Sequence, residues 1–280
     1  MPETEIDLQA ALHRLRLSDP HPLGDSPIAQ VWAVRQEDGT RAVLKLYTRA
    51  DRANEGPGVD LLRAWADRGA AQVIVEDGPI LLLEHLDGPL LGDIARGGED
   101  MRATELLAQT AARLHQRPTP SVPGLPCLET ITAPLFSLQR GAACDDGLWQ
   151  NIERAQDLAR DLLNSQPEQV PLHGDLHHDN VILTERGPRV IDAKGYIGDP
   201  AFEMANALRN PRGLPDLVRD PQRLRRCVAL YAEAMPVDPM RLTAWVAVKC
   251  ALSITWRAKG CIADDKEKDL LALFLREAGQ

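Results

Sequence analysis

The hydrophobic period of this 280-residue chain changes near residue 87, and this change limits the folds open to it. Before that point, apolar residues alternate or form short blocks, as in strands at 42–47 and 79–86. Beyond it, they recur every three or four residues, first over 101–116, as in helices. The sequence therefore predicts an α+β chain with a sheet-rich first lobe (1–86) and a mostly helical second lobe (87–280).

The first lobe is expected to contain two strand pairs. Residues 28–47 have strand patterns on both sides of Asp38-Gly39, a dipeptide that favours a tight hairpin turn. Residues 72–75 and 79–86 flank a second turn at 76–78. The period of two predicts that Lys45 points away from the leucines beside it.

Lys45 is a lone cation in an apolar strand. It either reaches solvent from an edge strand or contacts the phosphates of a nucleotide. In the second case an acid should pair with it, and Glu55 is the first candidate. Because Gly56-Pro57-Gly58 disfavours helix, a short helix is expected only over 60–68, which leaves Asp60 as the competing partner.

Two further segments are candidates for nucleotide contacts. Ser26 lies in a turn that begins at Gly24, where its hydroxyl and backbone N–H groups could contact phosphate, although an ordinary turn explains the pattern as well. The segment 84–89 leaves the last strand, so backbone groups of Glu84 and Leu86 are candidates to read an adenine edge. The alternative is a plain connection to the next helix.

The second lobe is expected to be built from helices joined by loops. Beyond 101–116, helical spacing recurs over four segments, 148–162, 224–235, 241–257 and 266–278. Four prolines make 118–126 a stiff loop. Trp245 and Trp256 are expected in the core, with stacking on a substrate as the alternative.

The residues with the most evident chemistry lie within 171–200. Asp175 is followed by Asn180, and a predicted hairpin between 181 and 191 returns the chain so that Asp192 comes close to both. Asp175 suits the activation of an acceptor hydroxyl. Asn180 and Asp192 suit a magnesium ion, which prefers oxygen ligands. This order of groups predicts transfer of a phosphoryl group.

Two other interpretations of this segment remain open. Its three histidines, His173, His177 and His178, suggest a zinc site of a hydrolase. Adjacent histidines diverge on a regular backbone, however, and no other His or Cys cluster completes a ligand set. Alternatively, the acids only cap turns in a non-catalytic nucleotide-binding module.

Three segments, LHGDLHHDNVIL, VIDAKGYIGDP and AFEMANALRNP, resemble the aminoglycoside phosphotransferase superfamily, most closely its streptomycin and hydroxyurea kinase branch. The resemblance implies a protein-kinase-like bilobal fold with ATP in the cleft and Mg²⁺ as cofactor. By position it implies that Asp175 is the catalytic base, that Asn180 and Asp192 hold the metal and that Lys45 contacts phosphate. It also implies that Asp199 supports the active-site loops.

The first lobe departs from this pattern in two places. The turn at Gly24 is poor in glycine, and Gly-Pro-Gly follows Glu55.

The balance of charged residues limits the kinds of molecule that the chain is expected to bind. With 41 acids against 32 Lys and Arg, the formal net charge is −9, which argues against nucleic acid and is compatible with a small cationic substrate. The branch resemblance favours streptomycin, with hydroxyurea or another hydroxyl metabolite as alternatives. Six acids are candidates to contact a cationic acceptor: Asp145, Asp146, Glu203, Asp264, Asp265 and Glu267.

The remaining patterns concern the environment of the chain. Its five cysteines are scattered and form no C-x-x-C pair, so neither a disulfide framework nor a zinc site is expected. The acidic N-terminus has no leader pattern, and no run of 18 apolar residues occurs. A cytoplasmic protein without a membrane span or an obligatory protein partner is expected.

Overall fold

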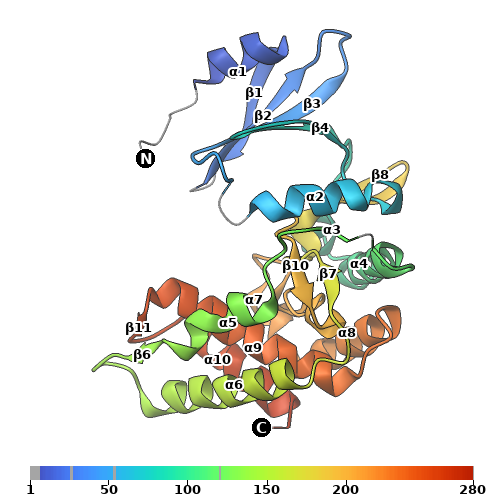
Figure 1. Ribbon diagram of the computed structural model, residues 1–280. Coiled ribbons are helices and arrows are strands. Elements are labelled where there is room, and N and C mark those ends of the chain that lie inside the picture. The colour runs from blue at the N-terminus through green and yellow to red at the C-terminus, as the bar shows by residue number, and fades with distance from the viewer. Residues whose placement is uncertain (1–6, 26–27, 53–54, 120, 280) are drawn as a thin grey trace.

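The computed structural model describes residues 7–25, 28–52, 55–119 and 121–279. An antiparallel sheet and a helical region lie one above the other, and α2 lies between them (Figure 1). The five strands of this sheet follow the order β1-β2-β3-β5-β4. Their bounds are β1 (Ser18–Asp25), β2 (Ala29–Arg35), β3 (Arg41–Tyr47), β4 (Val73–Asp77) and β5 (Ile80–Glu84).

Helices pack on both faces of the sheet. On one face, α1 (Leu8–Leu15) covers Leu44, Leu82 and their apolar neighbours. On the other face, Val59 of α2 packs with Tyr47 and Leu83. Lys45 lies on this second face with Tyr47, so its predicted direction away from the leucines of its own strand is confirmed.

The helical region is organised around α9 (Pro239–Ala258). Every residue of α9 from Leu242 to Thr255 is buried, because α5, α6, α8 and α10 all pack against it. The other α-helices of the described chain are α2 (Gly56–Ala64), α3 (Leu91–Arg96), α4 (Asp100–His115), α5 (Leu128–Phe136), α6 (Asp146–Asn164), α7 (Pro215–Val218), α8 (Pro221–Ala234) and α10 (Lys268–Glu277).

Short strands hold the loops above α9 in place. The antiparallel pairs are β7 (Val170–Leu172) with β10 (Tyr196–Gly198) and β8 (Val181–Thr184) with β9 (Gly187–Val190), and β6 (Gln139–Arg140) runs parallel to β11 (Cys261–Ile262). The β8–β9 hairpin also joins the two regions, because Val190 exchanges backbone hydrogen bonds of 2.8 and 2.9 Å with Gly69 and Ala71.

The broad sequence expectations are confirmed: both strand pairs, the β8–β9 hairpin and the long helices form. Several details differ. β1 was not expected, because its two prolines disfavour a strand; pairing with β2 forms it, with irregular register. α3 and α5 were also missed, since each is short. Trp245 is buried as predicted, but Trp256 is 43% exposed, so its expected place in the core is wrong.

None of the helices in the described ranges is both long and apolar enough to cross a membrane.

A buried polar cluster fastens α9 to the loop that follows β10. The Asp199 carboxylate has no solvent exposure, and it accepts hydrogen bonds from Trp245 Nε1 at 2.7 Å and Arg241 Nε at 2.5 Å. It also accepts the Ala201 N–H at 2.9 Å. All three donors lose their partner if this carboxylate is removed.

Asp199→Ala is therefore expected to lower the free energy of unfolding by about 3 to 5 kcal/mol, because the part-buried Arg241 guanidinium loses its ion pair and the buried Trp245 N–H loses its acceptor. Urea unfolding measures the effect. Asp161→Ala, at an exposed position on α6, is the control and should stay within about 0.5 kcal/mol of wild type. A loss of less than about 1 kcal/mol in Asp199→Ala would contradict this account.

Candidate active site

Two cavities meet the segment from Asp175 to Asp192. The smaller, about 420 Å³, lies between the sheet and the β8–β9 hairpin, and its lining includes Lys45, Leu86 and Asp192. The larger, about 920 Å³, lies in the helical region, and its lining includes Asp175 and Lys249. The predicted site residues therefore lie along the boundary between a nucleotide-sized cavity and a second cavity.

Lys45 is the centre of a buried ion cluster. Its Nζ lies 2.8 Å from Glu55 Oε2 and 2.9 Å from Asp192 Oδ1, and its side chain is 7% exposed. The other carboxylate oxygen of Glu55 accepts from Lys194 Nζ at 2.8 Å. Glu55 is thus the acid that pairs with Lys45, whereas Asp60 contacts Arg63 at 3.0 Å. The solvent-directed alternative for Lys45 is wrong.

Gly56-Pro57-Gly58 is helical, which corrects the prediction that helix starts only at residue 60. Glu55 lies directly before α2 without a side-chain capping hydrogen bond, and Pro57 fits the first turn, where a backbone N–H has no helical partner. A Cβ on Gly58 would lie 1.7 Å from the carbonyl oxygen of Ala193. Glycine therefore lets α2 approach the chain directly after Asp192, which brings Glu55 to both lysines.

The charges of this cluster support one another. Burial opposes ionisation of Glu55, but Lys45 and Lys194 outweigh it and lower its pKa to about 2. Burial also opposes the charge on Lys45, yet Asp192 and Glu55 raise the pKa of its ammonium above the ordinary value. Lys45 and Glu55 therefore both stay charged at neutral pH.

The structure brings Asp175, Asn180 and Asp192 together as the hairpin predicts. Asn180 Nδ2 donates to the carbonyl oxygen of Asp175 at 2.8 Å, and the Asn180 carbonyl accepts the Ile191 N–H at 3.0 Å. Asp192 has φ 59°, a left-handed conformation that few residues other than glycine adopt, and this backbone turn directs its carboxylate toward Lys45. Among the described residues, Asn180 Oδ1 and Asp192 Oδ2 have no hydrogen-bond partner.

The histidines of the segment do not form a metal site. His173 Nε2 donates to the Ile191 carbonyl at 2.9 Å, while its Nδ1 accepts the Asp175 N–H at 3.3 Å. His177 Nδ1 accepts the Asp179 N–H at 3.1 Å. Burial lowers the pKa of His177 to about 4 and that of His178 to about 3, so both are neutral at pH 7. Across the described ranges, no group of three or more His, Cys, Asp or Glu could hold a metal ion.

The Asp175 side chain is held from the helical region. Asn206 Nδ2 donates to Asp175 Oδ1 at 2.7 Å, and Arg209 Nη1 in turn donates to Asn206 Oδ1 at 2.9 Å. Burial raises the pKa of Asp175, but Lys249, His177 and Lys194 together outweigh it and keep the pKa below its ordinary value. Asp175 is therefore an oriented carboxylate that is ionised at neutral pH.

Sequence reasoning missed three residues at this site: Lys194, Asn206 and Lys249. The first two lie inside the segments VIDAKGYIGDP and AFEMANALRNP, in which only acidic residues were predicted to have a role. Lys249 had a visible signal, because it is a lone cation in the apolar run 242–252, much as Lys45 is in its strand.

Residues 84–88, at the end of β5, line the smaller cavity, but the predicted role of the Glu84 backbone N–H is wrong. The Glu84 N–H donates to the Gln72 carbonyl at 2.9 Å, so strand pairing continues through this residue and its N–H cannot read an adenine. Its carboxylate binds Arg186 and Arg189 at 2.7 and 2.9 Å. Leu86 lines the cavity, and in the described chain its backbone has no partner. Ser26 lies outside the described residues.

The acids expected to face a cationic acceptor are not gathered at the larger cavity. Glu203 is fully buried and accepts the N–H groups of His173 and Gly174 at 3.0 and 3.2 Å, so it holds the loop before Asp175. Four others do not line that cavity: Asp145, Asp146 and Asp264 contact residues outside it, and Asp265 binds Arg257 at its edge. Glu267 alone of the six lines the cavity, and it already accepts from Arg209 and Arg257.

Comparison with known proteins shows which family of enzymes the chain is similar to. The model of the aminoglycoside/hydroxyurea antibiotic resistance kinase family matches residues 16–260. Streptomycin 3''-kinase of Klebsiella pneumoniae is 36% identical over 229 residues, which cover 80% of this chain and 82% of that protein. Streptomycin 6-kinase of Streptomyces griseus is 31% identical over 232 residues, covering 80% and 73%.

Solved structures bear on the fold. An amicoumacin kinase in complex with AMP-PNP, Ca²⁺ and its antibiotic superposes with a TM-score of 0.69 at 14% identity, covering 98% of this chain and 93% of that one. Together with the antiparallel sheet and the helical region, this likeness confirms the expected protein-kinase-like fold.

Gly58→Ala is expected to lower the free energy of unfolding by about 1 to 3 kcal/mol, because its Cβ would force α2 away from Ala193. Urea unfolding tests this. Gly147→Ala in the first turn of α6, where the nearest atom is 3.3 Å away on the Asp145 side chain, is the matched control and should change stability by less than about 1 kcal/mol. Equal effects in both variants would refute the close approach as the reason for glycine.

Glu55→Gln should change how the free energy of unfolding depends on pH in the acidic range. Because the folded pKa of Glu55 is about 2 instead of the usual 4.5, its ionisation stabilises the fold by about 3 kcal/mol above pH 4.5. That contribution is lost as pH falls from 4.5 toward 2. The difference in unfolding free energy between wild type and Glu55→Gln should therefore shrink over this window. Glu37→Gln, which removes an exposed carboxylate, is the matched control for the substitution itself.

Proposed function

The chain belongs to the aminoglycoside/hydroxyurea antibiotic resistance kinase family, and on that premise we propose that it transfers the γ-phosphoryl group of ATP to a hydroxyl of a small molecule. The observation that carries this proposal is the position of Asp175 and Asp192. Asp192 contacts Lys45 at the smaller cavity, while Asp175 lines the larger one. One short segment thus contributes Asp192 to the proposed nucleotide cavity and Asp175 to the proposed acceptor cavity.

On the nucleotide side, we assign phosphate contact to Lys45. Glu55 holds its ammonium at 2.8 Å, so the charge is fixed in place before ATP arrives. The adenine would occupy the smaller cavity against apolar side chains that include Val31, Val43 and Leu83. The Leu86 backbone is the group that we assign to its polar edge.

A magnesium site fits the donors that are present. Asn180 Oδ1 and Asp192 Oδ2 have no partner among the described residues, and amide and carboxylate oxygens suit Mg²⁺. When bound, the ion neutralises charge on the phosphate oxygens of ATP. Lys45 holds the other oxygen of Asp192, and the Asn180 amide nitrogen is held by the Asp175 carbonyl, so both side chains are oriented.

On the acceptor side, Asp175 acts as the base. Its ionised carboxylate accepts the proton of the acceptor hydroxyl while the acceptor oxygen bonds to the γ-phosphorus and the bond from that phosphorus to the oxygen of ADP breaks. Asn206 fixes Asp175 Oδ1 at 2.7 Å and leaves Oδ2 for the acceptor. Asn206 is therefore a positioning residue.

The relatives indicate the first acceptors to test. Two of them are named for streptomycin, and the family description includes hydroxyurea. Streptomycin is the first candidate for this chain, and hydroxyurea or another small hydroxyl metabolite is the alternative. A nucleotide-binding module without catalysis is the alternative of another class.

Purified protein with ATP, Mg²⁺ and streptomycin is expected to yield ADP and a phosphorylated product, measured by coupled ADP release and mass spectrometry. Asp175→Ala should lose about 10² to 10⁴ in rate while still binding ATP, because it removes the base but leaves the smaller cavity intact. Asp157→Ala, at an exposed position on α6, should keep wild-type activity.

Two outcomes would contradict these assignments. Mg²⁺-dependent ADP release at the same rate in Asp175→Ala as in wild type would refute the role of Asp175. If wild-type protein released no ADP with streptomycin, hydroxyurea or a broad panel of hydroxyl compounds, the result would favour the non-catalytic nucleotide-binding module.

A further inference from the structure

The proposed reaction moves a charged group between two carboxylates. The γ-phosphoryl group leaves the nucleotide side, where Asp192 contacts Lys45, and bonds to an acceptor oxygen on the side of Asp175. Negative charge is spread over its outer oxygens in transit, so a fixed cation along this path would stabilise it. The candidates beside Asp175 or Asp192 are Lys45, Lys194, Arg209 and Lys249.

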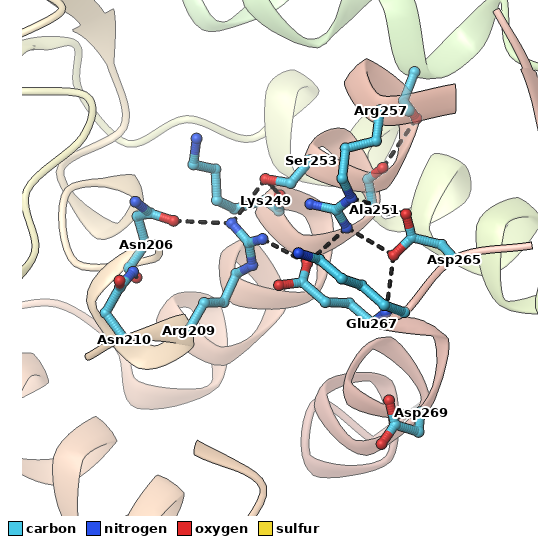
Figure 2. A network of polar contacts seen from close by, with 12 residues as sticks. Asn206, Arg209, Asn210, Lys249, Ala251, Ser253, Arg257, Asp265, Glu267 and Asp269 are labelled. Carbon is cyan, nitrogen blue, oxygen red and sulfur yellow. Dashed lines mark hydrogen bonds and ion pairs between the residues drawn. The ribbon is translucent and has the colours of Figure 1, made fainter. Parts of the chain in front are cut away.

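Two of these cations are held on the acceptor side of Asp175. Arg209 donates to three side chains of the helical region at 2.6 to 2.9 Å, and Figure 2 shows these contacts as one network. The Lys249 ammonium lies 4.6 Å from the centroid of the Trp256 ring, and Lys249 lines the larger cavity with Asp175. Both cations therefore belong to the helical region and the acceptor cavity.

Lys45 is engaged on the nucleotide side. Its ammonium donates to Glu55 at 2.8 Å and to Asp192 at 2.9 Å. An ammonium has three donors, so one is left for the phosphates of ATP, the role already assigned to this residue.

Lys194 lies between these two sets of contacts. Its Nζ is 2.8 Å from Glu55 Oε1, and the other oxygen of the same carboxylate binds Lys45. The Lys194 backbone N–H donates to the His173 carbonyl at 2.8 Å, which fastens the residue to the loop that carries Asp175. One residue thus connects the ion cluster of the nucleotide side with the loop of the base.

The Lys194 ammonium can also bind a ligand. Burial raises the pKa of Asp175, and Lys194 is one of the cations, headed by Lys249, that lower it, so its charge acts at the base. The side chain is 16% exposed, and within the described chain Glu55 is the one hydrogen-bond acceptor of its ammonium. Two of its three N–H donors therefore remain, and phosphate oxygens suit a lysine point charge.

We propose that Lys194 is a catalytic residue that binds the γ-phosphoryl group of ATP between Asp192 and Asp175 and stabilises its charge during transfer. Lys45 contacts phosphates that ADP retains, whereas Lys194 contacts the group that is transferred. Lys194 forms no covalent bond: the γ-phosphorus bonds to the acceptor oxygen, its bond to the oxygen of ADP breaks, and the hydroxyl proton goes to Asp175. This inference rests on the proposed kinase function and adds a residue to its mechanism.

Nucleotides with and without a γ-phosphoryl group separate the roles of the two lysines. Isothermal titration calorimetry in Mg²⁺ measures the affinities for AMP-PNP, which has this group, and for ADP, which lacks it. Lys194→Met should weaken AMP-PNP binding by about ten- to a hundredfold, the usual weight of a hydrogen bond to a charged group, and leave ADP binding unchanged. Lys45→Met should weaken both, because a strand lysine contacts the α- and β-phosphates.

Kinetics provide the second measurement. Lys194→Met should lower kcat by about 10² to 10³ with the acceptor that wild type phosphorylates fastest, because it removes a preorganised donor to developing charge. KM for that acceptor should not change, since Lys194 does not line the larger cavity. Lys259→Met, which removes an exposed lysine that lines neither cavity, is the matched control and should equal wild type in every measurement.

Thermal unfolding checks that each variant is folded. If Lys194→Met fails to fold because Glu55 loses a partner, the comparison is made with Glu55→Gln, where the carboxylate charge is absent. Lys194→Met combined with Glu55→Gln should bind AMP-PNP about tenfold more weakly than Glu55→Gln alone, with equal binding of ADP.

Two results would overturn the inference while leaving the kinase function in place. One is an equal loss of affinity for ADP and AMP-PNP in Lys194→Met, as in Lys45→Met, which would show that Lys194 only holds Glu55 and Lys45. The other is unchanged affinity for AMP-PNP in the folded variant. Wild-type protein that transfers no phosphoryl group to any acceptor would instead refute the proposed function itself.

Discussion

The contact between Lys45, Glu55 and Asp192 is the interaction on which the arrangement of the site depends. It joins a strand of the sheet, the first residue before α2 and the loop after the β8–β9 hairpin, and Lys194 closes it from the same loop. Separate buried charges are expensive, so each member requires the others to be in place. The absence of a Cβ at Gly58 permits the close approach of α2 that brings these groups together.

The segment between Asp175 and Asp192 divides two environments of different character. Toward the sheet, apolar side chains and one fixed lysine suit a nucleotide. Toward α9, basic residues and an exposed tryptophan ring surround the Asp175 carboxylate. Asn206 and Arg209 connect that carboxylate to the ion pairs of the helical region. The helical region therefore orients the Asp175 carboxylate, while Asn180 joins the Asp175 backbone to the nucleotide side.

Much of the fold and part of the site could be predicted from the sequence, because the signals are local. Strand alternation placed Lys45 on the face opposite its neighbouring leucines, and a hairpin pattern brought Asn180 and Asp192 together. Errors arose where tertiary contact overrides local preference. β1 forms despite two prolines because β2 supplies its partners, and Gly56-Pro57-Gly58 is helical because α2 must lie directly against Ala193.

The sequence by itself determined the order of chemical groups: a strand lysine, an aspartate with an asparagine five residues later, and a second aspartate after a hairpin. That order predicted the reaction, and the resemblance of three sequence segments predicted the family. Only the tertiary structure decided which charges face the acceptor. The resemblance to kinases of a polycationic acceptor predicted acids there, yet Glu267, the one of those six acids that lines the larger cavity, is matched by Arg209 and Arg257. Pairing of charges depends on distances in space, which neither composition nor local periodicity contains.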